Sequence, residues 1–230
     1  MNDTVSNTLK TEAYVVKRVN YGEADRIVTF ITPSGKIAAL ARGVRKEKSK
    51  LAGGLEAFVL TEICVRMGKK DLGTITGAKM LCFYKNILKN LDAMNLVADC
   101  LKKINKAAEG VDNAELFFLI QQTMKAVNSG ASLRIVEVWF LLNLMRAVGE
   151  EVNLYTDDDG NELVPGRQYS WNEGEGGFKD DRLGEFGENE IKLMRFMLRN
   201  SLLKTVKVRV GGDTLEKVYG LIRRIADDIL

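Results

Sequence analysis

The chain has 230 residues, of which 46% are hydrophobic and 28% charged, with a net charge of +3 and no histidine. This composition is typical of a globular protein with a buried core, and no apolar run approaches the roughly 18 residues that a membrane-spanning helix needs. The lack of histidine excludes Ser-His and Cys-His nucleophile pairs, the usual general base and the commonest zinc ligand.

Five short strands are predicted in the first third of the chain. Apolar and polar residues alternate with period two in the runs 12–19, 26–32, 36–41, 58–67 and 73–81. A basic stretch at 42–54 separates the third run from the fourth and is expected to be a flexible loop. Five short strands in so few residues fit a small closed barrel of the OB-fold type.

From residue 82 onward the hydrophobic period becomes helical. Helices are expected at 92–108, 113–127, 133–148, 188–203 and 214–230. The third is apolar on most sides and is expected in the core, and Thr214 is the expected N-cap of the last. The segment 153–187 has no helical period and is interpreted as an irregular insertion that could hold a short hairpin.

The predicted fold class is therefore α+β, with two domains. Residues 1–81 form a five-stranded OB-fold barrel, and residues 82–230 form an all-α helical domain with the insertion at about 153–187. Residues 1–80 hold 14 Lys and Arg against 8 Asp and Glu, a net charge of +6, whereas residues 81–230 hold 20 against 23, a net charge of −3. This uneven distribution favours a polyanionic partner for the first domain.

Cysteine use and the N-terminus both point to the cytoplasm. Cys64, Cys82 and Cys100 are far apart, odd in number and surrounded by apolar residues, which predicts buried, reduced thiols. The first ten residues are polar and lack the apolar core of a signal peptide. We therefore expect a cytoplasmic protein.

The strongest candidate site is a run of cations in and beside the basic stretch. The only acidic residue between positions 36 and 50 is Glu47. The cations there are Lys36, Arg42, Arg45, Lys46, Lys48 and Lys50. Cations on a loop can neutralise phosphates and release counterions, which gives salt-sensitive affinity without base specificity. A charge run is more often a plain solvated loop. Its position favours binding, because loops between the strands of an OB barrel border the binding face.

Other residues of the barrel are candidates to extend this phosphate-binding surface. The further cations are Lys17, Arg18, Arg26, Lys69 and Lys70, each of which taken alone is more often a solubilising residue. Tyr21, beside a turn glycine, is the best candidate for base stacking, whereas strand positions favour Phe30 and Phe58 as barrel core. No motif predicts a catalytic residue, a metal ligand or a cofactor site.

Several ordered motifs resemble the opening of the bacterial RecO proteins. They are Thr11-Glu12-Ala13-Tyr14-Val15-Val16-Lys17-Arg18, Asn20 to Thr29, Thr32-Pro33-Ser34-Gly35-Lys36, Ala41 to Lys46, Ser49 to Leu55 and Leu72 to Thr76. They cover roughly the first third of the chain and are specific as an ordered set. The remainder is similar only in its helical character.

The resemblance implies a recombination mediator of the RecF pathway in DNA repair. Such a protein binds single- and double-stranded DNA and anneals complementary strands, without enzymatic activity or a cofactor. The implied partners are DNA, RecR and the single-stranded-DNA-binding protein, whose acidic C-terminal tail docks on the helical domain in relatives. The resemblance assigns that tail to no numbered residue here, and it implies a cytoplasmic, nucleoid-associated protein.

One departure from the family concerns zinc. Many relatives carry a four-cysteine zinc module between helices of the second domain, but the equivalent stretch here, about 153–181, has no cysteine or histidine. We therefore expect no zinc. Our hypothesis is that packing of Tyr155, Tyr169, Trp171 and Phe178 replaces the metal bonds.

The main hypothesis is thus a DNA-binding repair mediator. The first alternative is an RNA-binding OB-fold protein, because phosphate contacts do not distinguish the two sugars. The second is a non-catalytic adaptor whose basic loop binds an acidic peptide. An enzyme ranks third, since it would depend on carboxylates or lysine alone.

Overall fold

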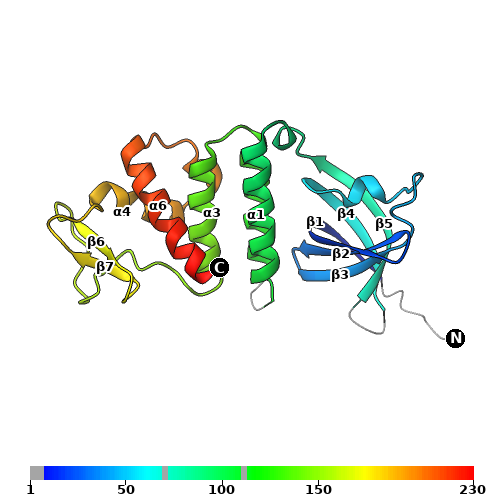
Figure 1. Ribbon diagram of the computed structural model, residues 1–230, viewed down its shortest axis with the longest axis horizontal. Coiled ribbons are helices and arrows are strands. Elements are labelled where there is room, and N and C mark those ends of the chain that lie inside the picture. The colour runs from blue at the N-terminus through cyan, green and yellow to red at the C-terminus, as the bar shows by residue number, and fades with distance from the viewer. Residues whose placement is uncertain (1–7, 69–71, 110–112) are drawn as a thin grey trace. The chain divides into compact units, whose positions relative to one another are not determined.

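The computed structural model describes residues 8–68, 72–109 and 113–230 (Figure 1). Contacts divide the chain into two compact units, Met1–Met124 and Lys125–Leu230. The first unit holds the barrel and most of the first two helices, and the second holds the later helices and a hairpin. The domain boundary proposed at residue 81 from the sequence remains a prediction.

Five strands form a closed barrel in the first unit. They are β1 (Thr8–Tyr21), β2 (Asp25–Thr32), β3 (Gly35–Ala41), β4 (Val59–Arg66) and β5 (Leu72–Phe83). Around the barrel the order is β1-β2-β3-β5-β4, and all pairs are antiparallel except β3 with β5. This five-stranded closed barrel confirms the predicted OB-fold.

The barrel core consists of the inward-facing residues of every strand. Phe30 and Ile63 are fully buried there, as the period-two pattern of β2 and β4 predicted. The connection from β3 to β4 contributes Val44 and, from the short 3-10 helix η1 (Ala52–Leu55), Leu55. The basic segment is therefore fastened to the barrel by apolar side chains on both sides of its lysines.

The outer face of β1 packs against two helices, α1 (Leu91–Ala107) and α2 (Asn113–Asn128). The Tyr14 ring lies 5.4 Å from the Phe117 ring, centroid to centroid. The Tyr14 hydroxyl also lies 2.9 Å from the hydroxyl of Tyr84, which precedes the 3-10 helix η2 (Ile87–Lys89). Asn90 begins α1, since its side chain accepts a hydrogen bond from the Ala93 amide at 3.0 Å.

The second unit is built around α3 (Leu133–Ala147), which is buried on most sides as predicted. The helices α4 (Glu188–Arg199), α5 (Leu202–Thr205) and α6 (Gly212–Ile229) accompany it, and α6 makes its main contacts with α3. No helix within the described ranges is long and apolar enough to cross a membrane.

Two helix boundaries predicted from the sequence are wrong. The helix expected over 188–203 ends at Arg199, because Asn200 is extended and its carbonyl accepts a hydrogen bond from the Trp139 indole at 2.9 Å. The last helix begins at Gly212 rather than at Thr214. The Thr214 hydroxyl does not cap the helix but donates to Glu190 at 2.7 Å.

The insertion does contain a hairpin, formed by β6 (Tyr169–Asn172) and β7 (Gly177–Asp180) (Figure 1). The Phe178 ring makes edge-to-face contacts with Tyr169, Trp171 and Phe186 at centroid distances of 6.5, 5.2 and 5.7 Å. The hypothesis had omitted Phe186 and wrongly included Tyr155, whose ring instead lies beneath the guanidinium groups of Arg195 and Arg199.

The expected absence of zinc stays a prediction, and the thiol prediction is confirmed only in part. Among the described residues, no group of three or more His, Cys, Asp or Glu side chains is placed to hold a metal ion. Cys100 is buried, as expected, but Cys82 is exposed and Cys64 is half-buried. Cys82 is exposed because it belongs to the last part of β5, where neither face of the strand is well covered.

Candidate nucleic-acid interface

The basic loop, residues 42–50, begins with a sharp turn that is tied to the β1–β2 turn and to the first residue of β2. Gly43 has a φ of +62°, and its amide donates to the Asp25 carboxylate at 2.7 Å. The Arg45 amide donates to the Ala24 carbonyl at 3.0 Å. These two bonds join the start of the basic loop to the β1–β2 turn, one of the connections that borders the ligand face of an OB-fold.

Consecutive turns with backbone hydrogen bonds follow, whereas the flexibility expected of this stretch stays a prediction. The Lys46 amide donates to the Gly43 carbonyl at 3.1 Å, and the Ser49 amide donates to the Lys46 carbonyl at 3.0 Å. Between them the Val44 side chain is only 4% exposed and packs into the barrel core. The loop is therefore a folded support that holds its cations outward.

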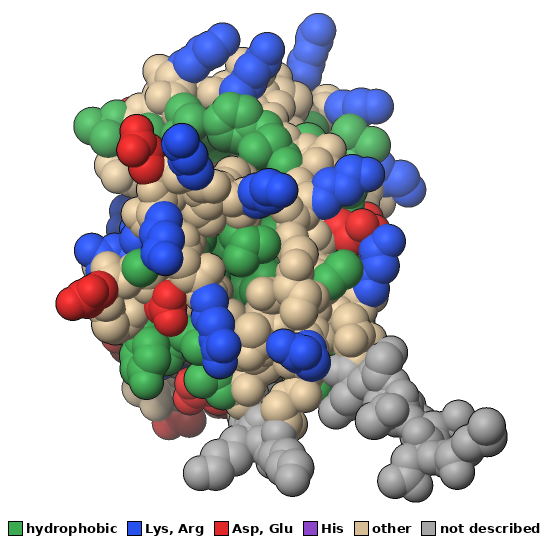
Figure 2. Space-filling model, turned by 90° about the vertical axis from the view of Figure 1, so that its right-hand side faces the viewer, with side chains coloured by type: hydrophobic (Ala, Val, Ile, Leu, Met, Phe, Trp, Pro, Cys, Tyr) green, Lys and Arg blue, Asp and Glu red, His purple; other side chains and the backbone are tan. Residues whose placement is uncertain are grey.

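Five predicted cations project from this loop into solvent, namely Arg42, Arg45, Lys46, Lys48 and Lys50. Within the described part of the chain, none of the five forms an ion pair. Arg45 makes a long hydrogen bond, 3.4 Å, to the Gly22 carbonyl. Figure 2 shows the face of the barrel unit, on which Lys and Arg side chains are widespread and Asp and Glu side chains are sparse.

Lys36 and Arg18 differ from the loop cations, because each already has an anionic partner. The Lys36 ammonium contacts the Asn105 carbonyl at 2.9 Å and the Glu109 carboxylate at 3.1 Å, both from the α1 side. Lys36 lies at the start of β3 and Arg42 follows its end, so a strand length of roughly 20 Å separates them. Arg18 pairs with Glu56 at 2.7 Å.

The remaining predicted cations are less engaged or lie outside the described residues. Arg26 donates to the Asn20 side chain at 3.1 Å, and Lys17 is exposed on β1. Lys69 and Lys70 lie outside the described residues. The structure thus brings together the five loop cations and places Lys36 apart from them.

Tyr21 is the predicted stacking residue that remains accessible. It ends β1, it is 55% exposed, and it precedes Gly22, whose carbonyl contacts Arg45. Tyr14 and Phe30 are fully buried and cannot receive a base. Proteins that bind single strands combine exposed aromatic rings, on which bases stack, with cations that contact the phosphates.

One exposed segment of the barrel was missed by the sequence prediction. All five residues from Lys79 to Phe83, at the end of β5, are exposed. The local sequence Lys79-Met80-Leu81-Cys82-Phe83-Tyr84-Lys85 interleaves apolar and cationic residues, which is the signal that could have drawn attention to it.

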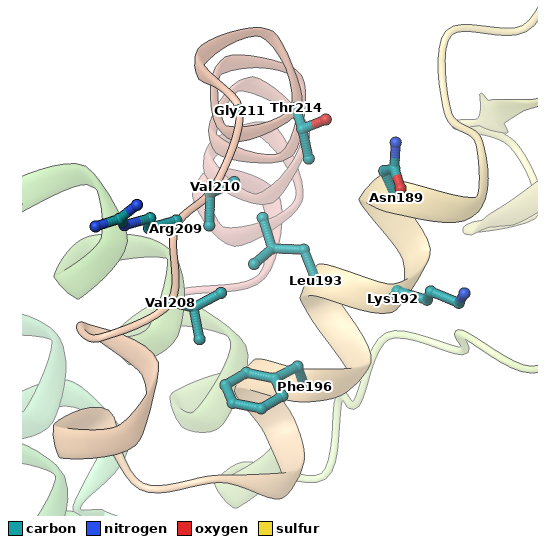
Figure 3. A pocket seen from close by; sticks show the side chains of 9 residues that line it. All are labelled: Asn189, Lys192, Leu193, Phe196, Val208, Arg209, Val210, Gly211 and Thr214. Carbon is teal, nitrogen blue, oxygen red and sulfur yellow. The ribbon is translucent and has the colours of Figure 1, made fainter.

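A separate groove of about 440 Å³ lies in the second unit (Figure 3). Leu193 and Phe196 of α4 face Val208 and Val210 of the segment that leads into α6, and Arg209 points outward at one side. Its floor is apolar and its rim is polar.

Beside this groove, Glu190 connects the starts of α4 and α6. Burial opposes ionisation of Glu190, but hydrogen bonds from the Thr214 hydroxyl and the Gly187 amide outweigh it and lower the pKa of the carboxyl. The ionised carboxylate therefore caps α4 and holds the start of α6 against it.

The barrel and its cationic loop define an OB-fold protein with features of a polyanion binder, joined to a helical domain. Comparison with known sequences identifies its family. Residues 5–84 match the family described as "Recombination protein O N terminal", and residues 104–228 match "Recombination protein O C terminal". The chain belongs to the RecO family of DNA repair proteins.

Individual relatives support this membership. The chain is 27% identical over 240 residues to the DNA repair protein RecO of Dehalococcoides mccartyi strain CBDB1, covering 96% of this chain and 90% of the relative. It is 31% identical over 147 residues to RecO of Roseiflexus sp. strain RS-1, covering 64% and 52%. It is 33% identical over 147 residues to RecO of Acetivibrio thermocellus, covering 62% and 58%.

Proposed function

We propose that this RecO protein binds single- and double-stranded DNA through the basic loop and promotes annealing of complementary strands. It acts as a recombination mediator in the cytoplasm, at the nucleoid, and makes or breaks no covalent bond. The observation that carries this proposal is a folded loop with five exposed cations that have no ion-pair partner among the described residues.

The physical basis is electrostatic. Cations that lack internal partners can displace the counterions condensed on DNA, and this release of ions drives binding without base specificity. Because turns and the Val44 side chain already fix the loop, less conformational entropy is lost when phosphates bind. Neutralised strands repel each other less, so complementary strands held on one surface can pair.

The test is an affinity and annealing measurement on a charge-reversed loop. Replacing Arg45, Lys46 and Lys48 with Glu is expected to weaken binding of a single-stranded oligonucleotide at least tenfold and to abolish strand annealing. The control replaces Lys179 and Arg182, two exposed cations of the hairpin region, with Glu. Equal losses in both variants, or none in the loop variant, would contradict the proposal. An RNA oligomer that outcompetes DNA of the same sequence would favour the RNA-binding alternative.

We further propose that the helical domain receives the acidic C-terminal tail of the single-stranded-DNA-binding protein, and that RecR is a second partner. The groove between α4 and residues 208–211 supports the first part, since apolar walls suit hydrophobic tail residues and Arg209 suits an acidic one. No residue is proposed for RecR.

A binding titration tests the tail proposal. A synthetic peptide with the last ten residues of the partner should bind the chain, and both Phe196→Ala and Arg209→Glu should weaken it at least fivefold. Arg182→Glu should leave the affinity unchanged. Wild-type affinity in both groove variants would reject this location.

A further inference from the structure

The end of β5 exposes apolar side chains that a barrel strand normally covers. Met80, Leu81 and Phe83 are 44, 41 and 45% exposed, and the residues between and before them are exposed as well. In a barrel strand, one face points into the core, so exposure should alternate. Here, both faces of the last five residues are open.

Strand pairing explains this exposure. β3 pairs with β5 only at residues 72–74, so the later part of β5 has β4 as its strand partner. Leu60 pairs with Cys82 and Thr61 with Met80, which leaves Leu81 as the extra residue of a β-bulge. Bulges redirect side chains and are frequent beside functional sites.

Phe83 lies next to a second aromatic residue in an unusual conformation. Val59 pairs with Phe83, and the Tyr84 amide donates to the Phe58 carbonyl at 3.0 Å. Phe58 has a φ of +59°, the left-handed region that a bulky residue rarely adopts. Such local strain persists where the surrounding structure imposes it, often at ligand sites.

Cationic side chains flank this apolar surface. Lys79 and Lys85 are exposed, and neither has an ion-pair partner among the residues that the structure describes. The connection from the basic loop runs through η1 to Phe58, and Gly54 of η1 packs directly against Ala78, the residue before Lys79. An exposed aromatic ring between cations, here Phe83, matches the chemistry of unpaired nucleotides, which have an apolar base and an anionic phosphate.

We propose that Phe83 stacks on an unpaired base of a strand whose phosphates contact the basic loop, Lys79 and Lys85. This inference rests on the proposed function and adds a residue that distinguishes single-stranded from double-stranded DNA. In a duplex the bases stack on one another and their faces are closed to a side chain. Phe83 therefore favours single-stranded over double-stranded DNA, whereas the loop cations serve both.

Two substitutions at Phe83 test this proposal by comparing strand types. Phe83→Ala should weaken binding of a single-stranded oligonucleotide about tenfold and change duplex binding less than twofold. Phe83→Trp should restore single-strand affinity, and its added fluorescence should be quenched by single-stranded DNA but not by duplex. The matched control is Phe118→Ala, another exposed phenylalanine of the same unit, 53% exposed, which should bind like wild type.

The outcomes separate this inference from the proposed function. The stacking role would be overturned if Phe83→Ala bound single-stranded DNA like wild type, or if it lost equal affinity for single-stranded and double-stranded DNA. The charge-reversed loop variant would still test DNA binding itself. If the wild-type chain has no salt-sensitive affinity for DNA, the proposed function fails first. A circular dichroism melt of each variant shows that the comparison concerns folded protein.

Discussion

The Asp25 carboxylate accepts a hydrogen bond from the Gly43 amide at 2.7 Å, and this contact joins the first residue of β2 to the start of the basic loop. It places an anion directly beneath a cationic segment. The anion is used to hold the backbone of the loop rather than to neutralise the side chains of Arg42 or Lys46. The loop thereby combines a fixed backbone with free positive charge.

Removing that carboxylate should destabilise the barrel. Asp25→Ala leaves the Gly43 amide without its acceptor, and we expect a loss of about 1–2 kcal/mol in the free energy of unfolding. Asp25→Asn keeps an acceptor oxygen and should lose less than half as much. Urea denaturation of the two variants and wild type measures this difference. Identical midpoints for all three proteins would show that the bond contributes nothing.

The turn at Gly43 should reject a side chain because of its backbone conformation. Its φ of +62° costs an L-residue about 1 kcal/mol, while an added Cβ would meet only the flexible Lys46 side chain at 3.6 Å. Gly43→Ala should therefore lower stability by about 1 kcal/mol in thermal or urea unfolding. Gly53→Ala, at a site with open space, is the control and should be neutral. A neutral Gly43→Ala variant would contradict the turn geometry.

The Tyr14–Tyr84 pair should make the protein sensitive to alkali. Burial raises the pKa of both phenols above the ordinary value of about 10, and for Tyr14 the hydrogen bond with Tyr84 raises it further. Above pH 10 the unfolded chain releases these protons and the folded chain keeps them, so stability falls as pH rises. Tyr14→Phe should show a shallower fall between pH 9 and 11, measured by urea unfolding, whereas Tyr21→Phe should behave like wild type. Parallel curves for all three proteins would exclude this origin.

The aromatic cluster should stabilise the hairpin region without metal. Phe178 is fully buried, and Phe178→Ala should cost about 3–5 kcal/mol or unfold the second unit. Leu183→Ala, at a side chain 94% exposed, should change stability by less than about 0.5 kcal/mol. A chelator should not shift the melting temperature of the wild-type chain, and elemental analysis should find no stoichiometric zinc. Zinc at one equivalent would reject the replacement of metal by packing.

Local sequence patterns predicted much of the fold. The alternation in β2 and β3 placed both strands within one residue of their observed ends, because a half-buried strand must alternate. The parallel pairing of β3 with β5 is not encoded in either strand alone and became apparent only from the barrel. In the same way, α4 ends where Trp139, 61 residues away in sequence, holds the Asn200 carbonyl.

The candidate site was predicted less completely than the fold. The cation run identified Arg45, Lys46 and Lys48, but charge alone could not separate them from Lys36, whose partner Glu109 is distant in sequence. Exposure of Phe83 depends on where β3 stops pairing and on a bulge, neither of which a hydrophobic pattern reports. Tertiary contacts therefore decide which of the predicted cations remain free to contact phosphates.

The salt dependence of single-strand binding tests the central claim most directly. Each phosphate contact contributes about 0.7 to the slope of log affinity against log salt concentration, so replacing Arg42, Arg45, Lys46, Lys48 and Lys50 with Gln should reduce the slope by up to about 3.5. Replacing Lys179 and Arg182 with Gln should leave the slope unchanged. A reduced slope for the loop variant alone is the predicted result, and a slope equal to that of wild type would contradict DNA binding by this loop.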